Sequence, residues 1–207
     1  MASTEPGREP WRPQIRRAGD NDAPDLSAML ARAFHEDPVI DWVFRDESRR
    51  APRARRYFAG RLKVLLPQGA CYTTSDGVGA ALWARPNEWR DPPLAALWQT
   101  VSFAPGIGRR SVQVLRGLRA VEALHPAEPH WYLAVLGIEP ERQGEGNGGA
   151  LIQPVLEDCD RQEVPAYLET ARERNVDFYT RHGFRVTDEL ELPDGPPVWL
   201  MWRDPRP

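Results

Sequence analysis

The sequence predicts a single-domain α/β (α+β) protein with a mixed, mostly antiparallel sheet flanked by helices. Short apolar runs of strand length alternate with longer segments whose apolar residues recur at helical spacing. An Asp76-Gly77 turn joins two of the strand runs as a hairpin. A chain of 207 residues that is 41% hydrophobic can bury one substantial core, and no linker-like segment divides it. We therefore expect residues 1–12 to form a disordered lead-in and residues 13–207 to form one domain.

The first half of the chain contains two predicted helices and three predicted strands. Asp22 is suited to cap the first helix, which carries Pro24 in its first turn. Its apolar residues share one helical face, at Leu26, Met29, Leu30, Ala33 and Phe34. This helix should end at Asp37-Pro38, because proline disfavours the helical conformation of the residue before it. The remaining expected elements are a strand over 14–17, a helix over 48–66 and strands over 70–75 and 78–84.

The second half opens with a helical pattern over 92–124 that is interrupted at 105–108. An apolar strand over 131–138 follows and runs through a short polar turn into a glycine-led helix that reaches about residue 163. The remaining expected elements are a strand over 166–170, a short helix over 175–182, and strands over 184–192 and 198–203. This order of elements gives the mixed sheet with helices on its faces.

Composition excludes several classes of partner. The formal net charge is −3, whereas a nucleic-acid-binding surface must be basic to neutralise phosphates. Cys71 and Cys159 lie far apart, and neither has a second metal-ligating residue at the usual spacing, so we expect no disulfide framework and no metal. The first residues include no apolar signal region, and no apolar run approaches about 20 residues. We expect small-molecule chemistry in the cytoplasm, without a membrane or nucleic-acid partner.

The most informative segment is the glycine-rich turn after the strand over 131–138. Its glycines are Gly144, Gly146, Gly148 and Gly149. Several glycines let backbone N–H groups converge on an anion, and the helix that follows adds the positive end of its dipole. The segment therefore predicts a pyrophosphate cradle.

A dinucleotide-binding fold is the alternative interpretation of this turn. Gly144, Gly146 and Gly149 fit the G-x-G-x-x-G pattern, and Glu169 lies at about the 20-residue distance expected of a ribose-binding acid. However, residues 139–143 separate the strand from the first glycine, and too little chain follows Glu169 to build the second half of such a fold. A P-loop is excluded because no Gly-Lys-Ser/Thr follows the turn.

Three motifs in order carry a resemblance to a known family. They are Gln143-x-x-Gly146-x-Gly148 after an apolar strand, Tyr167-Leu-Glu-Thr170, and the run from Asn175 through Tyr179 to Gly183-Phe184. Together they resemble the GNAT superfamily of acyl-CoA-dependent N-acetyltransferases. Within it, residues 128–203 are similar to the puromycin N-acetyltransferase group and its actinobacterial relatives, and residues 34–42 and 80–83 match more loosely. The combination of motifs in this order is specific, whereas each motif alone is weak.

The resemblance implies acetyl-CoA as the co-substrate and no metal. The central strand, here 131–138, is expected to separate from its parallel neighbour so that pantetheine can insert between them. Gly137 would suit a bulge or a close approach of the backbone. The residues expected to contact the cofactor are Leu136, Gly137, Ile138, Gln143, Gly144, Glu145, Gly146, Asn147, Gly148, Gly149 and Asn175.

The turn departs from the family pattern at two positions. Glu145 stands where a basic residue is common, and Asn147 stands where an aliphatic residue is common. An acid at position 145 would either repel the cofactor phosphates or point to solvent. We favour the exposed position, because the dipole of a helix favours an acid at its N-terminus.

The resemblance also indicates the reacting groups. Tyr179 is the expected general acid for the departing thiolate, and it shares a helical face with Asn175. The general base is open among Glu169, Glu36, Asp37 and His130, with a bound water as a further alternative. Of these carboxylates, Glu169 lies at a strand end and joins Tyr179 in the expected catalytic site.

Acceptor selectivity is expected in the break after the first helix and in the tryptophan-rich segments. Phe34, Trp42, Trp83 and Trp89 would line an apolar cleft, with Glu36 or Asp37 attracting an ammonium group. A basic run that ends at Arg61 is interpreted as a solvated helix face.

The sequence therefore predicts an N-acetyltransferase that acts on a primary amine of a small molecule, such as an antibiotic or an aminonucleoside. The amine would attack acetyl-CoA directly in a ternary complex, and the protein would be a monomer or a homodimer. The alternative is a catalytically silent sensor that binds acyl-CoA on the same fold.

Overall fold

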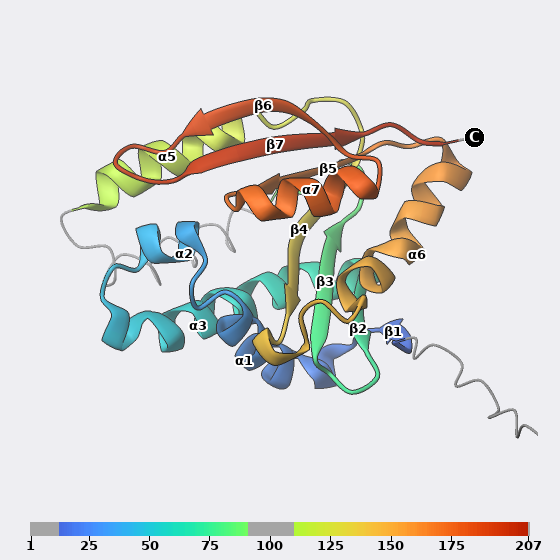
Figure 1. Cartoon of the computed structure of the whole chain (residues 1–207), viewed down its shortest axis with the longest axis horizontal. Helices are drawn as coiled ribbons and strands as arrows, with labels where there is room; N and C mark the ends of the chain where they lie inside the picture. The colour runs from blue at the N-terminus through green and yellow to red at the C-terminus, as the bar shows by residue number, and fades with distance from the viewer. Residues whose placement is uncertain (1–12, 91–109, 207) are drawn as a thin grey trace, which may run out of the picture.

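A seven-stranded sheet organises the protein (Figure 1). The computed structural model describes residues 13–90 and 110–206. The strands are β1 (Ile15–Arg17), β2 (Cys71–Thr74), β3 (Gly79–Ala84), β4 (Trp131–Ile138), β5 (Ala166–Thr170), β6 (Arg185–Glu191) and β7 (Pro197–Arg203). Their order in the sheet is β1-β2-β3-β4-β5-β7-β6, and every neighbouring pair is antiparallel except β4 and β5. The predicted mixed, mostly antiparallel sheet is confirmed.

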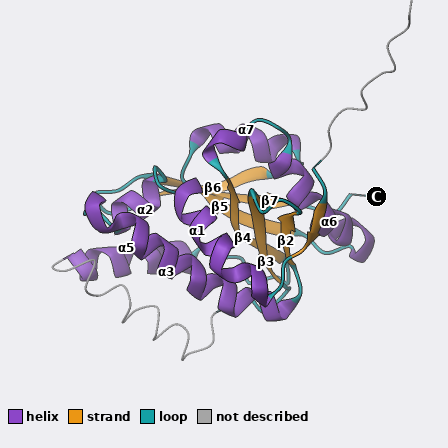
Figure 2. Ribbon diagram, turned by 90° about the horizontal axis from the view of Figure 1, so that it is seen from below, coloured by secondary structure: helices purple, strands orange, loops and turns teal. Residues whose placement is uncertain are grey.

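Helices cover both faces of this sheet. They are α1 (Ala23–Ala33), α2 (Pro38–Val43), α3 (Glu47–Leu65), α5 (Ser111–Ala123), α6 (Asn147–Gln162) and α7 (Glu173–Arg181), with 3-10 turns η1 (Asp20–Asp22), η2 (Leu66–Gln68) and η4 (Pro140–Arg142). Helices α1, α2, α3 and α5 gather on one side of the molecule (Figure 2). Helices α6 and α7 pack on the opposite face.

The alternation of side chains along β3 divides the interior into two apolar clusters. Leu82 packs in the cluster under α1, α2, α3 and α5, whereas Trp83 packs in the cluster under α6 and α7. The predicted stripe of α1 lies in the first cluster, where Leu26, Met29 and Leu30 are almost fully buried. Burial of each such side chain stabilises the fold by about 1.5–3 kcal/mol.

The sheet opens between β4 and β5. These parallel strands pair only from Trp131 to Leu133 on β4 and from Ala166 to Leu168 on β5. Beyond that point β4 stays paired with β3 as far as Ile138, while β5 stays paired with β7. The facing edges of β4 and β5 therefore separate toward their carboxyl ends, as the family resemblance implies.

Gly137 does not mark a bulge. The irregularity in the β3 and β4 pairing lies between Leu82 and Trp83, and Gly137 itself pairs in regular register. An ideal Cβ on Gly137 would lie 2.6 Å from Leu30 Cδ2 and 3.0 Å from Phe34 Cε2. The glycine therefore permits the close approach of α1 to β4, which is the second of the two roles expected for it.

One prediction about the N-terminal helices is wrong, and one helix was not predicted. Asp22 makes no capping hydrogen bond to α1; its carboxylate instead accepts from Arg16 and from the Gly19 N–H group. The first helix ends before Asp37-Pro38 as expected, but Pro38 also begins α2, a helix that the pattern did not indicate. Proline is favoured at this first helical position because its missing N–H group has no intrahelical partner there.

The other predicted elements agree with the structure to within a few residues, apart from two segments. Residues 1–12, the expected lead-in, and residues 92–109 of the expected helical pattern lie outside the described residues. The dinucleotide-binding interpretation is wrong, because a sheet with one parallel pair is not a doubly wound parallel sheet. Across 13–90 and 110–206, no helix combines the length and apolar content needed to cross a membrane.

Candidate active site

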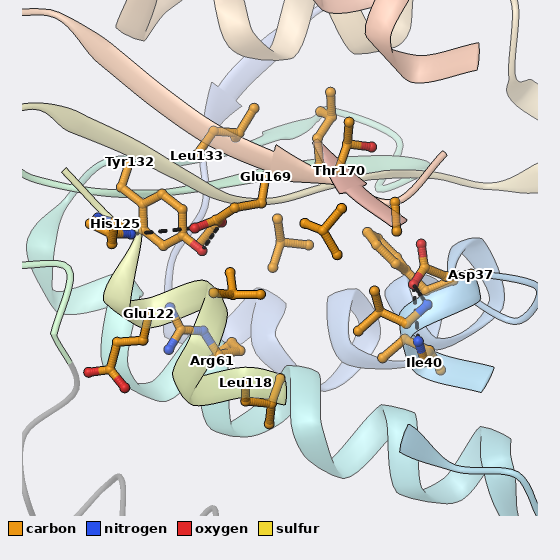
Figure 3. Close-up of a pocket in the computed structure, with 18 of the residues that line it drawn as sticks. Asp37, Ile40, Arg61, Leu118, Glu122, His125, Tyr132, Leu133, Glu169 and Thr170 are labelled. Carbon is orange, nitrogen blue, oxygen red and sulfur yellow. Dashed lines mark hydrogen bonds and ion pairs between the residues drawn. The ribbon is translucent and has the colours of Figure 1, made fainter. Parts of the chain in front are cut away.

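Two cavities meet where the sheet opens. The strand cavity, of about 520 Å³, lies at the separated ends of β4 and β5 and is walled by residues of α2, α3 and α5 (Figure 3). The turn cavity, also of about 520 Å³, lies over the glycine-rich turn and is walled by α7. Residues common to both walls are Phe34, Asp37, Leu136, Asn175 and Tyr179. The shared walls make the two cavities neighbouring parts of one site.

The glycine-rich turn presents the start of α6 to the turn cavity. Gly144 and Gly146 both have φ of +84°, a conformation that favours glycine. Helix α6 begins at Asn147 without a side-chain cap, and the first N–H groups of a helix lack intrahelical partners. An ideal Cβ on Gly149 would lie 2.9 Å from His182 Nε2, so a side chain there would intrude on the wall. The turn leaves exposed donors at the positive end of a helix dipole.

The turn cavity is rich in positive charge. Arg142, Arg172, Arg174 and Arg181 all line it, whereas Asp37 is the one acid in its wall among the described residues. Guanidinium groups bind phosphate oxygens by charge-assisted hydrogen bonds. The cavity is therefore suited to a ligand that carries several phosphates.

Most of the residues expected to contact the cofactor line this cavity: Leu136, Gly137, Ile138, Gln143, Gly144, Gly146, Asn147, Gly148, Gly149 and Asn175. Glu145 does not. Its side chain is exposed and accepts a hydrogen bond of 2.7 Å from Arg142 Nε. The acid is thus held by an arginine on the rim and does not face the cavity.

Two polar side chains of the turn have structural partners. Asn147 Nδ2 donates to the Arg142 carbonyl at 3.1 Å, and Gln143 Nε2 donates to the Ile138 carbonyl at 3.2 Å. The first bond ties the helix start to η4, and the second ties the turn to the end of β4. An amide at position 147 therefore fixes the shape of the turn, which an aliphatic side chain would not do.

Tyr179 lies in the wall that the two cavities share. Its ring packs against Phe178 and Phe184 with centroid separations of 5.0 Å and 5.9 Å. Burial, followed by the negative charge of Asp37, raises the pKa of Tyr179 above its ordinary range. The hydroxyl group is therefore protonated at neutral pH and can donate a proton at the junction of the cavities.

Glu169 reaches the strand cavity from the end of β5. Its Oε2 accepts a hydrogen bond of 2.7 Å from the Tyr132 hydroxyl, and its Oε1 lies 3.4 Å from His125 Nδ1 (Figure 3). Burial, followed by the charge of Glu169, raises the pKa of Tyr132 well above its usual value, so that the phenol stays a donor. Glu169 and Asp37 lie on opposite sides of the cavity (Figure 3).

Asp37 caps helix α2 through its side chain. Its Oδ1 accepts from the N–H groups of Val39 at 3.0 Å and Ile40 at 3.1 Å, which caps α2. Burial is the largest effect on this carboxyl and raises the pKa of Asp37. The residue lines both cavities, as does Phe34, and Trp89 lines the strand cavity.

Four of the candidate residues lie away from both cavities. Glu36 is exposed on the surface. Trp42 is buried with its Nε1 donating to the Pro193 carbonyl at 3.0 Å. Trp83 is fully buried in the cluster under α6, because alternation along β3 turns it to the other face of the sheet. His130 is buried behind His125. The expectation that these side chains reach the substrate is not supported.

The residues of the strand cavity that were not identified from the sequence include Arg61, Tyr132 and His125. Arg61 is 7% exposed and lines the cavity, so the interpretation of its helix face as solvated is wrong at that position. Tyr132 lies one residue into a predicted strand, where alternation alone gave no sign of its partner. His125 follows the last turn of α5 and belongs to no motif. The one signal in the sequence for this cluster was the carboxylate of Glu169, at the end of the strand adjacent to that of Tyr132.

Neither cysteine is suited to act as a nucleophile. Burial raises the pKa of Cys71 and of Cys159 to about 12, and neither residue lines the cavities. The thiolate is the reactive form of cysteine, and it is not populated at neutral pH in such surroundings. Among the described residues, no three His, Cys, Asp or Glu side chains are grouped so as to hold a metal ion.

A sheet opened between two parallel strands, beside an uncapped and glycine-led helix, is the arrangement that the family resemblance implies for an acyltransferase. The model of the acetyltransferase (GNAT) family matches residues 77–184, which is about half of the chain. The protein belongs to the GNAT family of acetyltransferases, whose donor is acetyl-CoA.

Relatives agree with this assignment. The chain is 25% identical over 205 residues to an uncharacterized N-acetyltransferase of Schizosaccharomyces pombe, covering 92% of this chain and 83% of that protein. A solved structure described as histone acetyltransferase HPA2 and related acetyltransferase, from Corynebacterium glutamicum, has a TM-score of 0.69 at 25% identity and covers 94% of this chain and 97% of its own.

More distant solved structures share the fold. Arylalkylamine N-acetyltransferase 2 of Aedes aegypti has a TM-score of 0.65 at 14% identity, covering 93% of this chain and 99% of its own. A polyamine N-acetyltransferase of Drosophila melanogaster has a TM-score of 0.65 at 16% identity, covering 92% of this chain and 98% of its own.

Proposed function

We propose that the protein transfers the acetyl group of acetyl-CoA to the primary amine of a small, largely apolar molecule. The amine attacks the thioester directly while both substrates are bound. The observation that carries this proposal is that the turn cavity and the strand cavity adjoin, with Tyr179 in their shared wall. A donor site and an acceptor site that meet at a protonated hydroxyl group suit transfer in a ternary complex.

The turn cavity fits the phosphates of coenzyme A. The N–H groups from Gly146 to Gly149 would hold the pyrophosphate, and the arginines of the wall would add charge. The separated edges of β4 and β5 would hold the pantetheine arm, because their backbone groups do not pair with each other there. When bound, acetyl-CoA supplies the activated acyl carbon. Positioning an amine about 3 Å from that carbon can contribute on the order of 7–11 kcal/mol.

Glu169 and Tyr179 divide the proton transfers between them. Glu169 accepts the proton of the attacking amine, directly or through one water, because its carboxylate lies in the wall of the strand cavity. Tyr179 gives its proton to the sulfur as the C–S bond breaks, because its hydroxyl group lies at the junction of the cavities. The amine nitrogen then carries the acetyl group, and coenzyme A leaves as a thiol.

The strand cavity favours a monoamine with an apolar body. Phe58, Leu118 and Val198 are among the apolar residues of its wall, and Trp89 adds an aromatic face. Two cations, Arg61 and Arg90, and three acids, Asp37, Glu122 and Glu169, also lie in the wall, so the preference rests on its apolar residues. We therefore expect arylalkylamines and amine-bearing antibiotics or aminonucleosides to be better acceptors than polyamines. The resemblance to the puromycin N-acetyltransferase group supports testing aminonucleosides first.

A panel of amines with acetyl-CoA, followed by release of free thiol, tests this function. Turnover should rank apolar monoamines above agmatine and spermidine. Native mass spectrometry of the same preparation should show coenzyme A bound in preference to NAD(H). Tight binding of coenzyme A without turnover of any amine would instead favour the catalytically silent sensor.

A further inference from the structure

A line of polar contacts leads from the strand cavity into the core behind Glu169. Glu169 Oε1 lies 3.4 Å from His125 Nδ1, and His125 Nε2 lies 2.9 Å from His130 Nε2. His130 Nδ1 in turn lies 2.6 Å from the Glu128 carbonyl oxygen. From this line we propose that His125 is a positioning residue that holds Glu169 as the ionised proton acceptor. The inference rests on the proposed function, in which Glu169 receives the proton of the amine.

The direction of each hydrogen bond can be worked out from the far end of the line. The Glu128 carbonyl can only accept, so His130 carries its proton on Nδ1. Burial is the largest effect on this ring and lowers the pKa of His130, which keeps the ring neutral. A neutral ring with a proton on Nδ1 has a lone pair on Nε2. His125 must therefore donate from its Nε2 to His130.

This tautomer determines what His125 presents to Glu169. If His125 were neutral with its proton on Nε2, a lone pair on Nδ1 would face the carboxylate at 3.4 Å. Two acceptors at that separation repel each other, so the pair needs a proton between them. Either Glu169 or His125 Nδ1 carries that proton, and the proposed role of Glu169 as proton acceptor requires it on His125, as an imidazolium. Tyr132 donates to the other oxygen of the same carboxylate, at 2.7 Å.

The surroundings fix the ring of His125 in place. Its side chain is 3% exposed, and the ring stacks on Trp89 at 3.6 Å between centroids. Tyr167 of β5 meets it edge to face at 4.7 Å. His125 also follows the end of α5, and the carbonyl end of a helix favours a positive charge. The ring therefore has little freedom to turn away from the carboxylate.

Other charged groups share this environment. Glu122 of α5 and Arg61 of α3 line the same cavity as His125. Tyr132 of β4 and His130, which precedes β4, contact the ring of His125. Of the acids in the described part of the chain, Glu169 is the one that lies against His125 Nδ1. The effect of His125 on catalysis should therefore pass through Glu169.

Nuclear magnetic resonance of the imidazole nitrogens tests the proton assignment without requiring turnover. At neutral pH, long-range ¹H–¹⁵N spectra of the full chain should show His130 as the neutral Nδ1–H tautomer and His125 as an imidazolium. Glu169→Gln should convert His125 to a neutral ring. A His130 protonated on Nε2, or a neutral His125 in the wild-type protein, would overturn the proposal even if the acetyltransferase assignment holds.

A double-mutant cycle tests the catalytic consequence once an acceptor is known. His125→Ala should lower kcat by about 10- to 100-fold, the range typical of groups that orient another functional side chain. In a Glu169→Gln background the same change should add less than about twofold, because coupled residues are not additive. Added imidazole should restore part of the activity of His125→Ala but none in the double variant.

Controls separate this role from a structural one. His35→Gln removes an exposed histidine outside both cavities and should leave kcat unchanged. The KM for acetyl-CoA should change by less than about twofold in His125→Ala, because His125 does not line the turn cavity. If His125→Ala does not fold, His130→Phe serves instead. It removes the lone pair of His130 Nε2 that accepts from His125, and it leaves His125 in place. Equal losses from His125→Ala with and without the Glu169 carboxylate would refute the proposal.

Discussion

Substitution of Tyr179 by phenylalanine isolates the role of one proton. Phenylalanine keeps the ring that packs against Phe178 and Phe184, and it removes only the hydroxyl group. We expect kcat to fall by about 10²–10⁴-fold, the usual range for a lost general acid. At about 1.4 kcal/mol for each factor of ten, this corresponds to about 2.8–5.6 kcal/mol of transition-state stabilisation. The KM for acetyl-CoA should stay close to that of the wild-type protein.

The pH dependence and a second donor sharpen this test. Because burial and Asp37 raise the pKa of Tyr179, its hydroxyl group stays protonated through the ordinary range for tyrosine. The wild-type kcat should therefore show no decline at about pH 10, the ordinary pKa of a tyrosine, that is absent from Tyr179→Phe. An activated acyl donor, whose leaving group needs no proton, should recover much of the lost rate in Tyr179→Phe.

A matched control is Tyr72→Phe, which removes a hydroxyl group from a buried tyrosine that lines neither the strand cavity nor the turn cavity. It should turn over at the wild-type rate in the thiol-release assay. Wild-type turnover by Tyr179→Phe, or an equal defect with activated and ordinary donors, would remove Tyr179 from the mechanism.

Substitutions at four further positions test individual features of the site. Gly137→Ala overpacks the contact between α1 and β4, so it should cost about 1–3 kcal/mol and lower Tm by about 2–4 °C for each kcal/mol; a Tm within error of wild type would contradict the close approach. The added Cβ of Gly146→Ala meets no atom within 4 Å, so the substitution should lower the stability of the fold only through backbone strain, by about 1–2 kcal/mol. Gly146→Asn should lower the stability less, because asparagine tolerates this backbone conformation. Equal losses of stability in the two variants would refute strain as the cause. Glu145→Gln removes a pair on the rim, so the KM for acetyl-CoA should change by less than about twofold; a larger, salt-sensitive decrease would mean that the acid repels the phosphates. Asp37→Asn keeps the cap of α2 and removes a buried charge. Because the pKa of Asp37 is raised in the folded protein, the wild type loses stability as the pH rises through that pKa, so the variant should melt a few degrees above wild type at neutral pH and lose this advantage in acid. A gain that persists in acid would exclude the charge as its cause.

The sequence predicted the sheet and the turn because those depend on local patterns. Alternation of apolar residues, the Asp76-Gly77 turn and the glycines from Gly144 onward act over a few residues, and each is found in the structure. The placement of Tyr179 in a cavity wall was also accessible, because helical spacing relates it to Asn175.

The contents of the strand cavity could not be predicted in the same way. Which face of β3 carries Trp83 depends on strand register, and a shift of one residue would reverse it. The contact between Glu169 and His125 joins residues 44 positions apart in the sequence through the parallel pairing of β4 and β5. Tertiary pairing, rather than residue type, decided which polar side chains entered the site.

The one parallel pair in the sheet accounts for the location of the site. Because β4 and β5 run in the same direction, their carboxyl ends lie at the same end of the sheet, where the two strands separate. The chain leaves β4 through the glycine-rich turn into α6 and leaves β5 directly into α7, so both helices begin beside the opening. An antiparallel pair would bring only one such helix start to that edge. The glycine-rich turn, the strand opening and the tyrosine on α7 therefore lie together because β4 and β5 are parallel in an otherwise antiparallel sheet.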